Sequence, residues 1–147
     1  MYRIRTVDGQ DDEISDTLEE LHRFTFFDSA PVPDFGLGHW WIVYHQSMPV
    51  AFAGLIASTR VEDAGYFCRV GVLREHWGKA LQFRLMRALE STARNNGWFW
   101  IVSDTTENIP SANNFIRAGY RLYRPQHPWG WSQTLYWRKF IRPASRR

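Results

Sequence analysis

The chain has 147 residues, enough for one domain with a sizeable core, and its 44% hydrophobic and 22% charged residues exclude a chain that is disordered throughout. Its single cysteine, Cys68, excludes an internal disulfide and a cysteine-based metal site, and no apolar run approaches the ~20 residues of a membrane-spanning helix. With a formal net charge of +3 and no apolar leader after Met1, we expect a cytoplasmic protein with no membrane association.

The spacing of apolar residues predicts strands and helices that alternate along the chain. In chain order, we expect a strand at 2–7, a helix capped by Asp12, a loop at 27–38, a hairpin of strands 39–45 and 50–58 that turns at 46–49, a strand at 65–72, a long helix at about 78–96, a strand at 98–102, a short helix near 111–118, and strands near 120–123 and 134–140. We expect Gly97 in the left-handed position that ends the long helix, and the apolar run at 98–102 buried on both faces.

This order predicts an α/β fold in which a central mixed sheet of six to seven strands is flanked by about four helices. We expect one domain over residues 1–147 with a basic tail at about 141–147, which contains Arg142, Arg146 and Arg147. The unit from 65 to 102 should be a right-handed parallel crossover. Ligands of such sheets bind where a strand ends and a helix begins, which directs attention to residues 73–82.

Residues 70–82 run from a strand into the long helix through small and polar side chains. Backbone N–H groups and the dipole at such a helix start favour a pyrophosphate, and Lys79 and Arg84 add positive charge. Many strand-to-helix turns contain a glycine and a lysine, so an ordinary turn is the alternative. A second segment, Asn108 to Tyr120, has Pro110 in the first turn of a short helix and Gly119 at its end, which by itself indicates only a capped helix and a turn.

Together, these two segments resemble the two sequence motifs of the GNAT N-acetyltransferases, in the usual order and at the usual separation. The first family motif, Val-x-Pro-x-x-Arg-Gly-x-Gly-x-Gly, corresponds to Val72–Gln82, and the second, Asn-x-x-Ala-x-x-Leu-Tyr-x-x-x-Gly-Phe, to Asn108–Tyr120. The resemblance covers nearly the whole chain and implies the GNAT fold, acetyl-CoA as co-substrate, and acetyl transfer to a primary amine by direct attack in a ternary complex. The residues that it implies for coenzyme A binding are Val70, Val72, Trp77, Gly78, Lys79, Ala80, Leu81, Gln82, Asn108, Ser111, Asn114 and Phe115.

Four of the chain's departures from the family pattern bear on cofactor binding or catalysis. Trp77 stands where the family's arginine is common, and Ala80 and Gln82 replace two glycines. We expect Ala80 to keep a negative φ and Gln82 to lie one turn into the helix, where its side chain can donate a hydrogen bond. Phe115 stands where many members keep a tyrosine as general acid, and a phenyl ring has no proton to donate.

Direct attack by an amine needs no protein nucleophile, and we interpret Cys68 as a core residue. The resemblance points to the backbone N–H around Val72 as the donor to the developing oxyanion. A lysine-like amine has a pKa of ~10.4 in water, so a general base is expected. We favour Asp104 over Glu62 or Asp63, while a turn residue that caps the backbone at 105–106 remains the alternative for Asp104.

Acceptor recognition is expected from the loop at 26–39 and from the segment around Trp129 and Trp131. Asp28 and Asp34 in the loop would attract a cationic amine, or are solvated turn residues. Small molecules, proteins and modified nucleic acids are the candidate acceptors, and a homodimer is the candidate assembly. The histidines lack metal-ligand spacing, so no metal is expected. The alternatives are a non-catalytic acyl-CoA sensor and a nucleic-acid-binding protein that uses the basic tail and exposed tryptophans.

Overall fold

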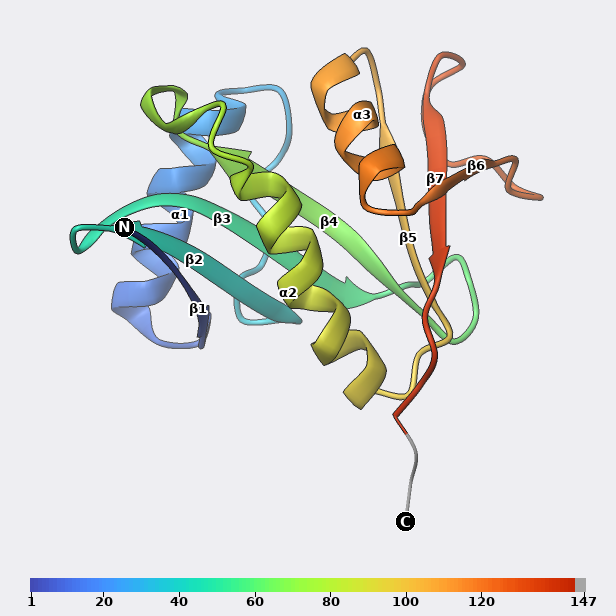
Figure 1. Ribbon diagram of the computed structural model, residues 1–147, viewed down its shortest axis with the longest axis horizontal. Helices are drawn as coiled ribbons and strands as arrows, with labels where there is room; N and C mark the ends of the chain where they lie inside the picture. Colours follow the sequence, from blue (N-terminus) through green and yellow to red (C-terminus); the bar gives the residue numbers. More distant parts are fainter. Residues whose placement is uncertain (145–147) are drawn as a thin grey trace. The chain divides into compact units, whose positions relative to one another are not determined.

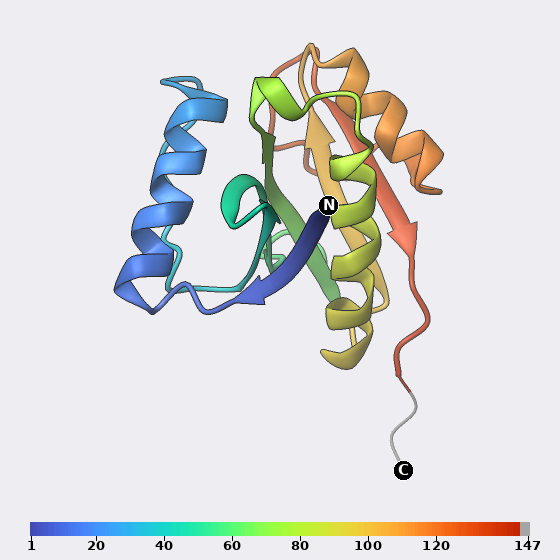
Figure 2. The same ribbon diagram turned by 60° about the vertical axis from the view of Figure 1, so that its left-hand side comes forward.

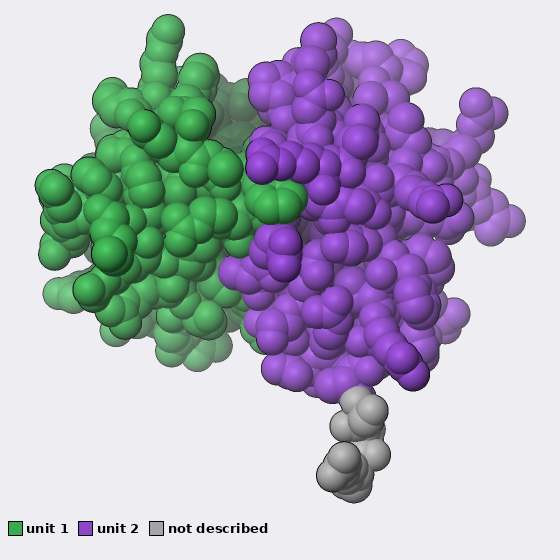
Figure 3. Space-filling view, in the orientation of Figure 1, with its two compact units in different colours: residues 1–56, 68–85 green, residues 57–67, 86–147 purple. Residues whose placement is uncertain are grey.

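The computed structural model describes residues 1–144 and divides into two compact units, each built from two segments of the chain. Unit 1 comprises residues 1–56 and 68–85, and unit 2 comprises residues 57–67 and the chain from 86 onward (Figure 3). Arg142 of the predicted basic tail is described and exposed, whereas Arg146 and Arg147 lie outside the described residues. The expectation of a single domain stays a prediction.

Seven strands, three α-helices and one short 3₁₀ helix make up the described chain (Figure 1). They are β1 Tyr2–Val7, α1 Asp12–Phe26, β2 His39–His45, β3 Met48–Ala57, β4 Ala64–Val72, η1 Arg74–His76, α2 Leu81–Asn95, β5 Trp100–Thr105, α3 Ile109–Arg117, β6 Arg121–Tyr123 and β7 Leu135–Phe140. The strands form one sheet in the order β1-β2-β3-β4-β5-β7-β6, in which β4 and β5 are parallel and β1–β2, β2–β3, β5–β7 and β6–β7 are antiparallel. The predicted mixed α/β class is confirmed, with three α-helices in residues 1–144 instead of about four.

Helix α1 of unit 1 begins one residue earlier than predicted. Asp11, not Asp12, is the N-cap, because its side chain accepts a hydrogen bond from the backbone N–H of Ile14 at 3.1 Å. Asp12 and Glu13 then occupy the first turn, where acidic side chains stabilise the positive end of the helix dipole.

The hairpin of β2 and β3 turns through only two residues. Gln46 and Ser47 both have positive φ, 50° and 70°, which is the backbone of the two-residue turns that match the twist of a hairpin. The prediction of a turn over 46–49 was therefore too long, and Met48 already belongs to β3.

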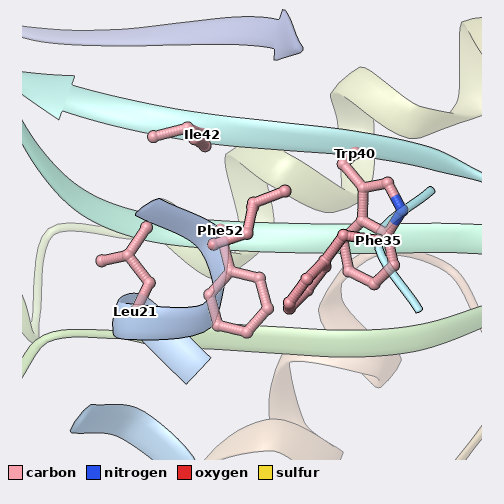
Figure 4. Close-up of a cluster of buried hydrophobic side chains, with 6 residues drawn as sticks. Leu21, Phe35, Trp40, Ile42 and Phe52 are labelled. Carbon is pink, nitrogen blue, oxygen red and sulfur yellow. The ribbon is translucent and has the colours of Figure 1, made fainter. Parts of the chain in front are cut away.

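The core of unit 1 lies between α1 and the strands β2 and β3, as the close-up of its buried side chains shows (Figure 4). Its buried members are Leu18, Leu21, Phe35, Trp40, Ile42 and Phe52. Trp40 is held by a hydrogen bond from its indole N–H to the carbonyl of Leu37 at 2.7 Å. A Cβ at Gly54 would overlap the Trp40 ring, so only glycine fits there. The loop after α1 is attached to this core by the buried ring of Phe35 and by the carbonyl of Leu37, which accepts from Trp40. Figure 2 shows α1 along one side of the strands.

Unit 2 buries an aromatic core between α3 and the strands β5 and β7. Phe115 of α3 lies 5.8 Å from Phe67 and 5.7 Å from Trp137, measured between ring centroids. Strand β5 begins at Trp100, two residues later than predicted, and Phe99 is 44% exposed, so the burial expected for 98–102 applies from Ile101 onward.

Helix α2 ends as predicted and begins later than predicted. Gly97 has φ 76° and donates to the carbonyl of Arg94, which confirms the left-handed C-terminal cap. The helix begins at Leu81, not at Gly78, because Gly78 and Ala80 both have positive φ, which an α-helix cannot include.

One buried histidine, His22 of α1, is held neutral in unit 1. Its Nε2 accepts a hydrogen bond from Nε of Arg69 at 3.3 Å, its Nδ1 has no partner in residues 1–144, and its ring stacks on Phe26 at 4.7 Å. Burial, and then the charge of Arg69, lower the pKa of His22 below its usual value of about 6.5.

The free energy of unfolding is expected to be constant above about pH 6.5 and to fall as the pH drops below it. The sign follows because the lowered pKa makes folded His22 bind fewer protons in that range than unfolded His22 does. Urea titrations between pH 5 and 8 measure this. His22→Gln keeps an acceptor for Arg69 and should reduce the decrease of the free energy of unfolding below about pH 6.5. The part of that decrease that is due to His45, whose pKa is also lowered, should remain. An equally steep limb in His22→Gln would contradict the assignment.

Candidate functional site

In unit 1, Trp77 fixes the segment between β4 and α2 to the end of β4. The indole N–H of Trp77 donates to the carbonyl of Val72 at 2.8 Å, and the Arg74 guanidinium carbon lies 5.7 Å from the ring centroid. Trp77 remains 63% exposed. The side chain in the position of the family's arginine therefore shapes the turn and lies at the surface.

The backbone after Trp77 alternates in the sign of φ. Trp77 has φ −64°, Gly78 has φ 77° and Ala80 has φ 58°, while Lys79 is not among the residues with positive φ. Such alternation turns successive N–H groups toward one concave side, which is how backbone nests bind anions. The prediction of a negative φ at Ala80 was wrong: Ala80 adopts the left-handed conformation that the family's glycine would take without strain.

The start of α2 carries no acidic residue in its first turn, in contrast to α1. The carbonyl of Ala80 accepts the first helical hydrogen bond, from the N–H of Arg84 at 3.0 Å. Gln82 is thus the second residue of the helix, not one turn into it as predicted, and Leu81 is buried. Exposed Lys79 and Arg84 flank this helix start. The dipole, the cations and the nest-like backbone fit an anionic group such as pyrophosphate.

The start of α3, in unit 2, is capped, and the helix begins at Ile109, two residues earlier than predicted. Asn108 is the N-cap, since its Oδ1 accepts from the N–H of Ser111 at 3.1 Å, and Pro110 lies in the first turn. Gly119, with φ 90°, follows the end of the helix. Asn114 is half-buried on this helix.

Phe115 is a core residue with an exposed fraction of 1%. Its ring also contacts Tyr120 edge to face at 4.9 Å. The Tyr120 hydroxyl is buried without a partner among the described residues, and burial, followed by the charge of Glu90, raises the pKa of Tyr120 far above its ordinary range. Neither ring presents a proton donor at the surface.

The parallel pairing of β4 and β5 is short. Three residue pairs, from Ala64↔Trp100 to Tyr66↔Val102, form the ladder. At the next position the carbonyl of Phe67 accepts from the side-chain hydroxyl of Ser103 at 2.8 Å. A side chain therefore replaces the backbone partner where the ladder ends.

Asp104, at the end of β5, is held by two aromatic side chains. Its Oδ2 accepts from the Tyr66 hydroxyl at 2.6 Å and from the Trp129 indole N–H at 2.9 Å. No hydrogen bond to the backbone at 105–106 involves this carboxylate within residues 1–144, so the capping alternative is not what the structure shows. The sequence did not predict Tyr66 as a partner, although it shares a sheet face with Asp104 through the Tyr66↔Val102 register.

A hollow of about 510 Å³ opens in unit 2 beside Trp129. It is lined by Thr59, Arg60, Val61, Glu62, Tyr123, Pro125, Gln126, His127 and Trp129. Glu62, a candidate base, thus lines the hollow, whereas Asp63 uses its carbonyl to accept from the N–H groups of Phe99 and Trp100. The sequence predicted the Trp129 wall but not the wall at 59–62, because nothing in that stretch forms a motif.

The other predicted features have plain structural roles or stay predictions. Cys68 packs against the core of unit 1, and burial raises the pKa of its thiol to about 11. In the loop, Asp34 accepts from the N–H of Gly36, which is the turn interpretation, and Asp28 is exposed. In residues 1–144 no three His, Cys, Asp or Glu side chains gather as metal ligands, and no helix there has the length and apolarity to cross a membrane.

The predicted residues fall into two sets, one in each unit. Unit 1 brings together the residues at the end of β4 and the start of α2: Val70, Val72, Trp77, Gly78, Lys79, Ala80, Leu81 and Gln82. Unit 2 contains Asp104 on β5 and Asn108, Ser111, Asn114 and Phe115 at or in α3.

A comparison with family models matches residues 6–120 of the chain to the model described as "Acetyltransferase (GNAT) family". That range is well over half of the chain and includes both helix starts. No curated protein matches the sequence.

Among solved structures, three similar ones illustrate the shared fold. A Klebsiella pneumoniae protein assigned as an acyl-CoA N-acyltransferase has a TM-score of 0.73 at 21% identity, covering 96% of this chain and 98% of that chain. The Bacillus cereus IAA acetyltransferase has a TM-score of 0.74 at 11% identity, covering 96% and 100%. YncA of Salmonella typhimurium, solved with its cofactor acetyl-CoA, has a TM-score of 0.74 at 14% identity, covering 100% and 98%. At these identities, the likeness shows the fold.

Proposed function

Because the chain belongs to the acetyltransferase (GNAT) family, we propose that it transfers the acetyl group of acetyl-CoA to a primary amine by direct attack in a ternary complex. The observation that carries this proposal is the start of α2, where the sign of φ alternates from Trp77 to Ala80 and the first turn lacks acidic side chains. Both features suit a pyrophosphate, which coenzyme A contains.

In this proposal, coenzyme A is bound by the backbone from Gly78 to Gln82, with Lys79 as a counter-charge. Val70, Val72 and Trp77 would contact it beside the strand end, and Asn108, Ser111, Asn114 and Phe115 of unit 2 are further proposed contacts. Acetyl-CoA supplies the activated thioester. The backbone N–H around Val72 would donate to the carbonyl oxygen on which negative charge develops.

Asp104 is the proposed general base. The two hydrogen bonds to its Oδ2 orient the carboxylate and leave Oδ1 with no hydrogen bond in the described part of the chain. An acceptor amine reaches Asp104 as an ammonium ion and must lose a proton before it can attack, so a fixed carboxylate is suited both to bind the cation and to take the proton.

Departure of coenzyme A needs no tyrosine in this proposal. Phe115 has no proton to give, and an alkyl thiol with a pKa of about 8.5 is a tolerable leaving group near neutral pH. We therefore expect kcat/KM to rise with pH to a plateau without an alkaline decline from an enzyme acid.

The loop at 26–39 and the segment of Trp129 and Trp131 are the proposed recognition elements for the acceptor, whether it is a small molecule, a protein or a modified nucleic acid. A homodimer and a cytoplasmic location stay predictions. A non-catalytic acyl-CoA sensor is the second candidate, favoured by the absence of tyrosine at Phe115; binding of acetyl-CoA without turnover of any amine would establish it.

Acetyl-CoA at about 100 times its dissociation constant is expected to raise the free energy of unfolding by ~2.7 kcal/mol, because it binds only the folded chain. Thermal unfolding with acetyl-CoA, with CoA and with 3′-dephospho-CoA measures this, and adenosine, which lacks the pyrophosphate, is the control. No shift with millimolar acetyl-CoA would contradict the proposed function.

A further inference from the structure

On the premise that the chain acetylates an amine, we infer that the hollow beside Trp129 binds an aromatic ring of the acceptor, which is therefore a primary amine joined to an aromatic ring by a short alkyl chain. The volume of about 510 Å³ lies in the range of small-molecule sites, which runs from about 300 to 1,000 Å³. Its walls offer flat surfaces: the rings of Trp129 and Tyr123, and Pro125.

The Trp129 wall is fixed before any ligand arrives. The indole N–H is bound to Asp104, and the ring meets Tyr136 edge to face at 4.7 Å and Tyr66 at 6.4 Å, between centroids. The Tyr136 hydroxyl accepts from the N–H of Gly130 at 2.6 Å, which anchors the next residue of the loop. A ring held in this way binds a flat partner without losing rotamer freedom, which makes it a good recognition surface.

The charges around the hollow favour a neutral body. Arg60 and Glu62, which are opposite in sign, are the only Asp, Glu, Lys or Arg residues in the described chain that line the hollow. A polyamine would need several carboxylates here and a phosphate-bearing ligand several cations, and neither set lines the hollow. The Arg60 guanidinium carbon lies 5.8 Å from the Trp129 ring centroid, so the two groups contact each other in the wall of the hollow, and both kinds of group stack on aromatic rings.

The single positive charge of the acceptor is matched by Asp104. The indole of Trp129 bonds to Asp104 through its N–H and lines the hollow with its ring, so the carboxylate and the hollow lie at one and the same side chain. Oδ1 of Asp104, which accepts no hydrogen bond in the described chain, would take the ammonium group. The amine and the ring of the acceptor are therefore separated by about the width of one indole, which a short alkyl chain spans.

The test is calorimetry on the full chain saturated with CoA, which allows an acceptor to bind without turnover. The probes are phenethylamine, 2-cyclohexylethylamine (the same size without an aromatic ring), 2-phenylethanol (the same ring without the amine) and spermidine. We expect phenethylamine to bind about three- to tenfold more tightly than the cyclohexyl analogue, and more tightly than the other two probes.

Two variants locate the ring. Trp129→Leu should abolish the preference for phenethylamine over its cyclohexyl analogue. Phe140→Leu, which changes an exposed aromatic residue of the same unit that does not line the hollow, should keep it. If Trp129→Leu fails to fold, Glu62→Lys is the alternative variant, because it makes the hollow cationic. It should weaken the binding of phenethylamine and leave the affinity for CoA unchanged.

The outcomes separate this inference from the proposed function. The inference would be overturned if spermidine or the cyclohexyl amine bound as tightly as phenethylamine or more tightly. It would also be overturned if the protein acetylated other amines but not phenethylamine. Tight phenethylamine binding that depends on Trp129, but without acetyl transfer, would uphold the aromatic site and count against the proposed function.

Discussion

An Asp104→Asn variant is expected to lose about two orders of magnitude in kcat/KM for acetyl transfer to an amine, within the 10²–10⁴ range typical of a positioned general base. The amide oxygen of Asn can still accept from Tyr66 and Trp129, whose donors lie 2.6 and 2.9 Å from Oδ2 in the parent. The fold and the Trp129 wall should therefore persist, so that the loss reports proton removal. Steady-state release of CoA thiol, followed across pH 6–10, measures both the rate and its pH dependence.

If Asp104 is the general base, its replacement should also shift the dependence of kcat/KM on pH. In the variant the rising limb should shift to higher pH, since only the fraction of amine already neutral in solution can then attack. Tyr66→Phe removes one of the two donors to Oδ2 and should cost less than Asp104→Asn. An unchanged rate in Asp104→Asn would move the role to ordered water or to Glu62, which lines the hollow; Glu62→Gln then distinguishes these two.

The strands were predicted well because each carries its signal locally. Residues 2–7 and 39–45 alternate or cluster apolar side chains, and their observed bounds are the predicted ones. The hairpin turn was predicted too long because Gln46 and Ser47 adopt positive φ without the glycine or asparagine that normally marks a two-residue turn. The pairing of β2 with β3, which runs to His45↔Met48, imposes that backbone. The identities of the two turn residues alone do not predict how the strands on either side pair.

The site shows the same division between local and long-range information. Both helix starts were recognisable because a motif is a stretch of neighbouring residues. The environment of Asp104 was not, since its partners are 38 and 25 residues away and meet it only through the β4–β5 ladder and the loop before β7. The wall at 59–62 likewise depends on tertiary contacts. The sequence thus indicated which backbone fits an anion, whereas the surroundings of Asp104 needed the structure.

Ala80→Asp is expected to weaken CoA binding at least tenfold, or roughly 1.4 kcal/mol. Ala80 precedes the first residue of α2, and its φ of 58° belongs to the alternating backbone that would surround the pyrophosphate. A carboxylate there would repel the anion in the position where N–H groups should donate to it. The fold should persist, because Asp tolerates left-handed φ better than Ala and an acidic side chain stabilises a helix N-terminus. Calorimetry of CoA binding gives the affinity, and thermal unfolding of the free chain gives the stability.

Ala80→Asn is the matched control for this charge effect, since Asn has the size of Asp and its tolerance for positive φ but carries no charge. It should bind CoA within a few-fold of the parent. An equal loss in both variants would mean that side-chain bulk, not charge, disturbs the turn between Trp77 and Leu81, while unchanged affinity in Ala80→Asp would place the pyrophosphate elsewhere. High salt sharpens the distinction, because it screens exposed charges and should narrow the gap between Asp and Asn without restoring a site that bulk has closed.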